Sequence, residues 1–144
     1  MPPPERDPID LAARALRHRD RSRHELDDRL ARAGVGDEER ADVLDALERV
    51  GYVDDARFAV ARAEALAGRG YGDEAIRHDL TRHGIDAEGV ADAIAGLDPE
   101  LERARALVER LGCSAKTALN LARKGFGEEA VEAAVGTDVA QGDG

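Results

Sequence analysis

The chain has 144 residues and a formal net charge of −10, with 42% hydrophobic and 36% charged residues but only two Phe, two Tyr and no Trp. Good helix formers dominate, which favours an all-α protein with a thin core, and the acidity argues against non-specific nucleic-acid binding as the main activity. The single cysteine, Cys113, excludes an internal disulfide, and no apolar run reaches the ~20 residues that a membrane helix needs. Because the start also has no apolar secretory core, we expect a cytoplasmic protein.

The first predicted helices follow a short lead-in. Residues 1–8 hold four of the five prolines and are expected to be disordered. Apolar residues at helical spacing then predict a helix ending near His18. Ser22 and Glu25 form a capping-box pattern that opens a second helix, which Gly34 ends in a left-handed conformation, and a third helix is predicted over residues 38–50. The buried faces of the second and third helices are expected to be Leu26, Leu30 and Ala33, then Val43, Leu44, Leu47 and Val50.

Similar start and stop signals divide the rest of the chain. Asp54 or Asp55 is placed to cap a helix that carries Phe58 as a core residue. The glycine-rich run over residues 68–72 then predicts a hinge between helices, in which Tyr71 packs on its own repeat or, alternatively, stacks on a nucleobase. Residues 137–144 are expected to form a disordered tail. Asp73 and Asp86 are each expected to cap the helix that follows, and further helices are expected to begin at Asp98-Pro99, Ser114 and Glu128.

One sequence pattern recurs three times along the chain. It consists of an apolar residue, a Leu four positions later and a Gly four positions after that, followed by another apolar residue. The copies, separated by 50 and 41 residues, are Leu26–Leu30–Gly34, Ile76–Leu80–Gly84 and the degraded Thr117–Leu121–Gly125. We therefore predict three tandem three-helix, helix-turn-helix-like repeats over residues 9–53, 54–97 and 98–136, the last one shortened, stacked into an elongated, curved rod.

Several of these segments resemble the RecX family of regulatory proteins. The stretches 22–34 and 72–85 are similar to the first and second repeats of that family. The most specific likeness is the junction between them, where the family has Gly, two apolar residues, Asp-Asp, one further residue and then Arg-Phe-Ala. In this chain the junction reads Gly51-Tyr52-Val53-Asp54-Asp55-Ala56-Arg57-Phe58-Ala59. The likeness is strong over residues 9–97 and weaker to residue 135.

The resemblance implies an all-helical, non-enzymatic regulator that binds in the groove of the RecA–DNA filament. Binding there would inhibit the ATPase, strand-exchange and co-protease activities of RecA. Two features depart from the family pattern, namely the strong acidity of the chain and the eroded third repeat at Thr117. Both bear on direct DNA affinity more than on filament binding, so we expect at most a weak contact with single- or double-stranded DNA. We also expect a monomer.

The basic residues are segregated from the acidic ones along the chain. Functionally, this indicates a discontinuous stripe that faces phosphates or acidic RecA loops, because a guanidinium pairs bidentately with either anion. The alternative is an ordinary set of solvated helix faces, paired at i,i+4 spacing. The residues expected to contact RecA or DNA are Arg14, Arg17, Arg21, Arg23, Arg69, Arg77, Arg82, Lys116, Arg123 and Lys124.

No residue pattern indicates catalysis or metal binding. The four histidines fall at no zinc spacing, and Asp54-Asp55 is better explained by helix capping than by a metal pair. The glycine run lacks the Lys-Ser/Thr of a phosphate-binding loop. We therefore expect no enzyme activity, no metal and no cofactor. Two alternative functions stay open, a helix-turn-helix DNA-binding regulator and a generic helical scaffold for another protein.

Overall fold

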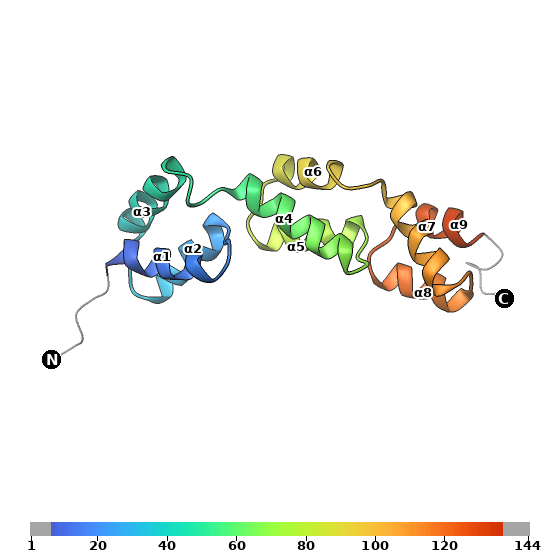
Figure 1. Cartoon of the computed structure of the whole chain (residues 1–144). Coiled ribbons are helices and arrows are strands. Elements are labelled where there is room, and N and C mark those ends of the chain that lie inside the picture. Colours follow the sequence, from blue (N-terminus) through green and yellow to red (C-terminus); the bar gives the residue numbers. More distant parts are fainter. Residues whose placement is uncertain (1–6, 137–144) are drawn as a thin grey trace.

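The computed structural model describes residues 7–136, and within that range it contains nine α-helices and no strand. The prediction of an all-α fold built from three-helix repeats is confirmed. The helices form three bundles that follow one another in a row (Figure 1), which we call the first, second and third unit. In chain order the helices are α1 (Pro8–His18), α2 (Arg23–Arg32) and α3 (Asp37–Arg49), α4 (Asp55–Gly68), α5 (Asp73–Arg82) and α6 (Ala87–Ala95), and α7 (Glu100–Leu111), α8 (Ala115–Arg123) and α9 (Glu128–Val135).

Each unit buries its own apolar cluster, and among the described residues no cluster spans two units. The Leu of the repeated pattern belongs to the cluster of its unit, and Leu30, Leu80 and Leu121 are all at most 1% exposed. Burying one such side chain contributes about 1.5–3 kcal/mol, so each small core depends on a few positions. Phe58 is a core residue, as predicted, and Tyr71 packs on the cluster of its own unit. The exact limits of the repeats and the curvature of the row stay predictions.

The repeated pattern has one geometric cause in all three units. The glycine that follows each second helix has a positive φ, +89° at Gly34, +80° at Gly84 and +91° at Gly125. This left-handed turn lets the next backbone N–H return to the carbonyl of the patterned Leu. The three equivalent bonds run from Val35 to Leu30, from Ile85 to Leu80 and from Phe126 to Leu121, with N–O distances of 3.0–3.1 Å. The turn thereby places an apolar side chain under each second helix.

The predicted helix starts are confirmed at most positions. Ser22 and Glu25 form the complete capping box, and Asp54, Asp86 and Ser114 each accept a hydrogen bond from the third residue of their helix. At the start, Asp7 caps α1 and Pro8 is its first residue, so the helix takes in the end of the expected lead-in. The rest of that lead-in, residues 1–6, and the expected tail, residues 137–144, lie outside the described residues.

Three predictions about individual residues and one about a segment are wrong. Ala33 and Val50 are exposed rather than buried, because each lies just past the end of its helix, where the chain turns away from the core. Val53 is buried in place of Val50. The cap of α5 is the backbone of Gly72 rather than Asp73, whose side chain binds elsewhere. The fourth error is the hinge expected over residues 68–72.

The segment over residues 68–72 is a packed joint rather than a hinge. The N–H of Gly72 donates to the carbonyl of Lys124 in the third unit at 2.8 Å, and Gly72 is buried. A Cβ at Gly72 would come within 2.5 Å of the backbone nitrogen of Phe126. Two backbones approach each other so closely here that only a residue without a Cβ fits. Glycine is therefore required at position 72 for space, and not only for its conformational freedom.

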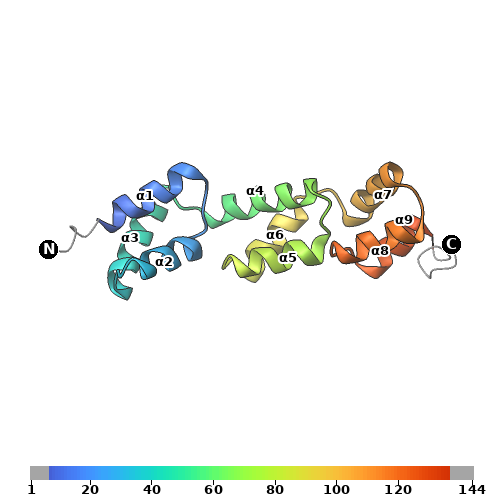
Figure 2. The same ribbon diagram turned by 90° about the horizontal axis from the view of Figure 1, so that it is seen from below.

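The second helices of the three units lie end to end along one side of the row (Figure 2). Gly84, at the end of α5, approaches His24 at the start of α2, and a Cβ there would overlap the His24 side chain. Gly125, at the end of α8, approaches Ala75 at the start of α5 in the same way. The N–H of Glu74 donates to the carbonyl of Gly125 at 3.1 Å. The order α8, α5, α2 thus forms a line in which each helix end meets the start of the next.

Candidate functional site

Both joints between units use the same carboxylate contact. At the first joint, Asp55 accepts a hydrogen bond from the backbone N–H of Arg23 at 2.8 Å. At the second joint, Glu100 accepts from the backbone N–H of Asp73 at 2.7 Å. In each case the acceptor is the first residue of the first helix in the downstream unit, and the donor is the first residue of the second helix in the upstream unit. A carboxylate at this place accepts a hydrogen bond from a backbone amide that has no partner within its helix. The positive end of the helix dipole also stabilises its negative charge.

The second joint carries several further polar contacts. Glu100 also accepts from the N–H of Gly127 at 2.9 Å, so one carboxylate joins the starts of α5 and α9. Arg103, with an 11% exposed side chain, pairs with Asp73 at 2.9 Å and donates to the carbonyl of Tyr71 at 3.3 Å. This network fixes the orientation of the third unit relative to the second by polar bonds, since the two units share no apolar cluster.

Burial perturbs one of the joint carboxyls. Burial is the largest influence on Asp55 and raises its pKa, while the hydrogen bond from the Arg23 backbone opposes that shift. The neighbouring Asp54 and Glu48 charges raise the pKa of Asp55 further. The two adjacent aspartates thus have different roles. Asp54 caps α4, whereas Asp55 connects the first and second units.

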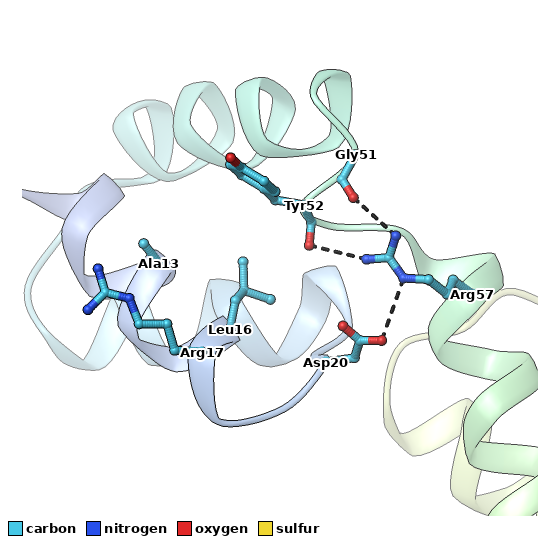
Figure 3. Close-up of a pocket in the computed structure, with 7 residues that line it drawn as sticks. All are labelled: Ala13, Leu16, Arg17, Asp20, Gly51, Tyr52 and Arg57. Carbon is cyan, nitrogen blue, oxygen red and sulfur yellow. Dashed lines mark hydrogen bonds and ion pairs between the residues drawn. The ribbon is translucent and has the colours of Figure 1, made fainter.

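A cleft of about 550 Å³ opens beside the first joint (Figure 3). Its lining comes from α1, from the connection between α1 and α2, from the turn before α4 and from α4 itself, and consists of Ala13, Leu16, Arg17, Asp20, Gly51, Tyr52 and Arg57. Arg57 closes one end, donating to the carbonyls of Gly51 at 3.1 Å and Tyr52 at 3.4 Å and pairing with Asp20 at 3.5 Å. These bonds connect the two units across the cleft end.

The remainder of the cleft is open and amphipathic. The Tyr52 residue is 65% exposed and borders the cleft above Leu16 (Figure 3). Arg17 lies opposite Arg57 and forms no ion pair within the described residues. An apolar floor, an exposed phenol and an unpaired guanidinium suit a protein side chain or loop with an acidic group.

The ten predicted contact residues fall into two groups. Four have partners within the chain: Arg21 donates to the carbonyl of Ala15, Arg23 pairs with Asp45 and Glu48, Arg77 pairs with Glu74, and the ammonium of Lys124 lies 4.2 Å from the ring centre of Tyr71. The positive charge of each of these four side chains is therefore at least partly engaged by contacts within the chain. The other six form no ion pair within residues 7–136 and are exposed, namely Arg14, Arg17, Arg69, Arg82, Lys116 and Arg123.

The six unpaired cations are not gathered in one cluster but are distributed over all three units. Arg14 and Arg17 lie on α1, Arg69 follows α4, Arg82 ends α5, and two lie on α8. Sequence reasoning missed the contacts of Asp55, Glu100 and Arg103, since each joins residues about thirty positions apart.

The described part of the chain shows no group of three His, Cys, Asp or Glu side chains that could hold a metal ion. None of its helices has the length and apolar character to cross a membrane. What the structure does present is a set of surface features suited to binding, which are the cleft and the unpaired cations.

Comparison with known proteins identifies the family. The model of the first three-helix domain of RecX matches residues 9–47, and the model of the second matches residues 54–94. The crystal structure of RecX from Lactobacillus salivarius superposes with a TM-score of 0.78 at 18% identity, covering 93% of this chain and 95% of that one. That likeness supports the fold, including the third unit, which neither family model matches.

Curated relatives cover nearly the whole chain. The regulatory protein RecX of Xanthomonas axonopodis pv. citri (strain 306) is 34% identical over 94% of this chain and 90% of the relative. The regulatory protein RecX of Acidithiobacillus ferrooxidans (strain ATCC 53993 / BNL-5-31) is 36% identical over 90% of this chain and 89% of the relative. Together with the two domain matches and the three-unit fold, these similarities show that the chain belongs to the RecX family of regulatory proteins.

Proposed function

We propose that this chain binds along the groove of the RecA–DNA filament and inhibits the ATPase, strand-exchange and co-protease activities of RecA. The observation that carries the proposal is the tandem arrangement of three units in a protein of the RecX family. Units repeated in a row suit a partner that is itself a polymer, because each unit can contact a successive subunit. Several weak contacts made in series add avidity without requiring a large interface on any one unit.

The cleft beside the first joint supports the proposal as a contact site for RecA. Tyr52 and Leu16 offer apolar surface, and Arg17 offers an unpaired charge for an acidic RecA loop. Binding that favours one filament state over another would shift RecA toward an inactive or disassembling form. In this proposal the chain acts by binding alone, as a cytoplasmic monomer without catalysis.

Direct DNA contact is a minor part of the proposed function. The net charge of −10 opposes phosphate binding, so any contact with single- or double-stranded DNA would be weak and confined to local basic sites such as α8. A sequence-reading regulator would need side chains that face base edges on a recognition helix. The chain has one Asn and one Gln, which disfavours that alternative.

The test is a titration of the full chain into RecA that is hydrolysing ATP on single-stranded DNA. The proposal expects the rate to fall in a saturable manner at or below one chain per RecA subunit. An unchanged hydrolysis rate across the titration, together with no association with the filaments, contradicts it.

A matched pair of variants tests the role of the cleft. Tyr52→Ala removes an exposed side chain from the cleft, and Val60→Ala removes one from the 46% exposed Val60 of α4, which does not line the cleft. We expect Tyr52→Ala to raise the concentration for half-inhibition about fivefold, consistent with the loss of one aromatic contact. Val60→Ala should behave as the unmodified chain, and equal effects of the two variants would exclude the cleft as a contact site.

A further inference from the structure

One arginine occupies the same repeat position in all three units. Arg32, Arg82 and Arg123 are the last residues of α2, α5 and α8, and each lies two positions before the left-handed glycine of its unit. We call these three residues the arginine row. Two of them were expected to contact RecA or DNA, but Arg32 was not, because its equivalence is apparent only when the three units are compared.

The arginine row is free to bind a partner. All three side chains belong to exposed residues, and within residues 7–136 none of them forms an ion pair or a side-chain hydrogen bond. By contrast, arginines on the first helices of the second and third units are engaged, as Arg62 is with Asp79 and Arg103 with Asp73. The row is thus a repeated surface feature whose side chains have no hydrogen-bond or ion-pair partner within residues 7–136.

The line formed by the second helices sets the spacing of the row. Because α5 follows α8 and α2 follows α5 end to end, equivalent residues recur along one direction (Figure 2). Ten helical residues span about 15 Å and the capping turn adds about 5 Å, so the step between neighbouring arginines is roughly 20 Å. Such a step is comparable to the width of a small protein subunit and far exceeds the spacing of phosphates on a nucleic acid, which is a few ångströms.

We infer that the arginine row binds identical carboxylates presented by successive subunits of a protein polymer. The same arginine position in every unit is useful for binding only if the partner presents an anionic group at a similar spacing. Nucleic acid presents phosphates so densely that it would not require this register, and the net charge of −10 opposes it. A planar guanidinium pairs bidentately with a carboxylate, which gives each contact a defined geometry. The inference rests on the proposed function and names the contacts that it would use on RecA.

A charge at a helix end has an ordinary alternative explanation, which the test must separate. Basic residues are favoured at helix C-termini by the helix dipole, without any partner. Arg49 is the matched control, because it also ends a helix, is exposed and forms no ion pair within the described part of the chain. It lies on α3, outside the line of second helices.

The experiment measures binding of the full chain to RecA filaments assembled on poly(dT) with a slowly hydrolysed ATP analogue. The variants are Arg32→Gln, Arg82→Gln, Arg123→Gln, the triple variant and the control Arg49→Gln. We expect each row variant to weaken binding about fivefold and the triple variant about a hundredfold, since the positions are far enough apart to act independently. The control should stay within about twofold, and all variants should keep the helical circular dichroism of the unmodified chain.

The outcomes separate the row from the function on which it rests. If the unmodified chain binds filaments and the triple variant binds as Arg49→Gln does, the row is overturned and the proposed function stands. If the unmodified chain does not bind filaments, the proposed function fails and the row fails with it. The triple variant could also lose binding to bare poly(dT), with the salt dependence of the affinity reduced by the equivalent of about three phosphate contacts. In that case the row contacts phosphates and the carboxylate assignment is wrong.

Discussion

Replacing Glu100 with Ala should loosen the third unit while leaving its helices formed. The Glu100 carboxylate accepts backbone hydrogen bonds from Asp73 at 2.7 Å and from Gly127 at 2.9 Å. Those donors belong to two different units, so the substitution leaves free amides at the starts of α5 and α9. No other side chain of the described residues bonds to either amide.

The expected loss follows from the two bonds. A hydrogen bond to a charged group contributes about 1.5–3 kcal/mol when buried, and Glu100 is partly buried, so we take the lower end for each bond. The unfolding free energy of the third unit should therefore fall by about 3 kcal/mol. Glu102→Ala is the matched control, because Glu102 lies in the same first turn of α7, is exposed and forms no bond within residues 7–136. It should change stability by less than about 0.5 kcal/mol.

Urea unfolding combined with amide hydrogen exchange measures this prediction. Since each unit has its own core, exchange at individual amides reports local opening that a single unfolding curve would average. We expect the amides of Asp73 and Gly127 to exchange at least tenfold faster in Glu100→Ala and unchanged in Glu102→Ala. Equal unfolding curves for the two variants, with protection of both amides retained, would refute the role assigned to Glu100.

Two further predictions concern backbone approach and acid stability. Gly72→Ala should separate the second and third units, because its Cβ would meet the Phe126 backbone, whereas Gly36→Ala has open space at its Cβ and should not affect the joint; small-angle scattering and exchange at the Gly72 amide compare the two. The hydrogen bonds from Arg62 hold the pKa of Asp79 below its ordinary value. The stability that this carboxylate contributes is thus present above the unfolded pKa of about 3.9 and is lost as the pH falls through the lowered folded value. In Arg62→Gln, the unfolding free energy measured with urea should decrease less as the pH is lowered. An identical pH dependence of the unfolding free energy in the variant and in the unmodified chain would contradict the assignment.

Local sequence signals predicted much of the fold. The capping box at Ser22, the caps at Asp54 and Asp86 and the left-handed turn at Gly34 each depend on residues within a few positions of one another. Such short-range preferences are readable from one sequence, and their recurrence at Gly84 revealed the repeat. The family resemblance was carried by the same segments.

The contacts between units could not be predicted in this way. Asp55 matches a helix-start signal as well as Asp54 does, and only the packed structure shows that it bonds to the backbone of Arg23. The glycine run before α5 has the composition of a hinge, yet Gly72 is required by the close approach of another unit. Among the proposed contact cations, Arg23 pairs with acids on α3 that are more than twenty positions away, which charge patterning along the sequence does not reveal.

Electron cryomicroscopy of RecA filaments saturated with the full chain tests the central claim most directly. The account predicts continuous helical density within the filament groove, with the three units of one chain following successive RecA subunits and α8, α5 and α2 in line along the contact. Filaments without added density, or chains attached through one unit with the other two projecting into solvent, would contradict it.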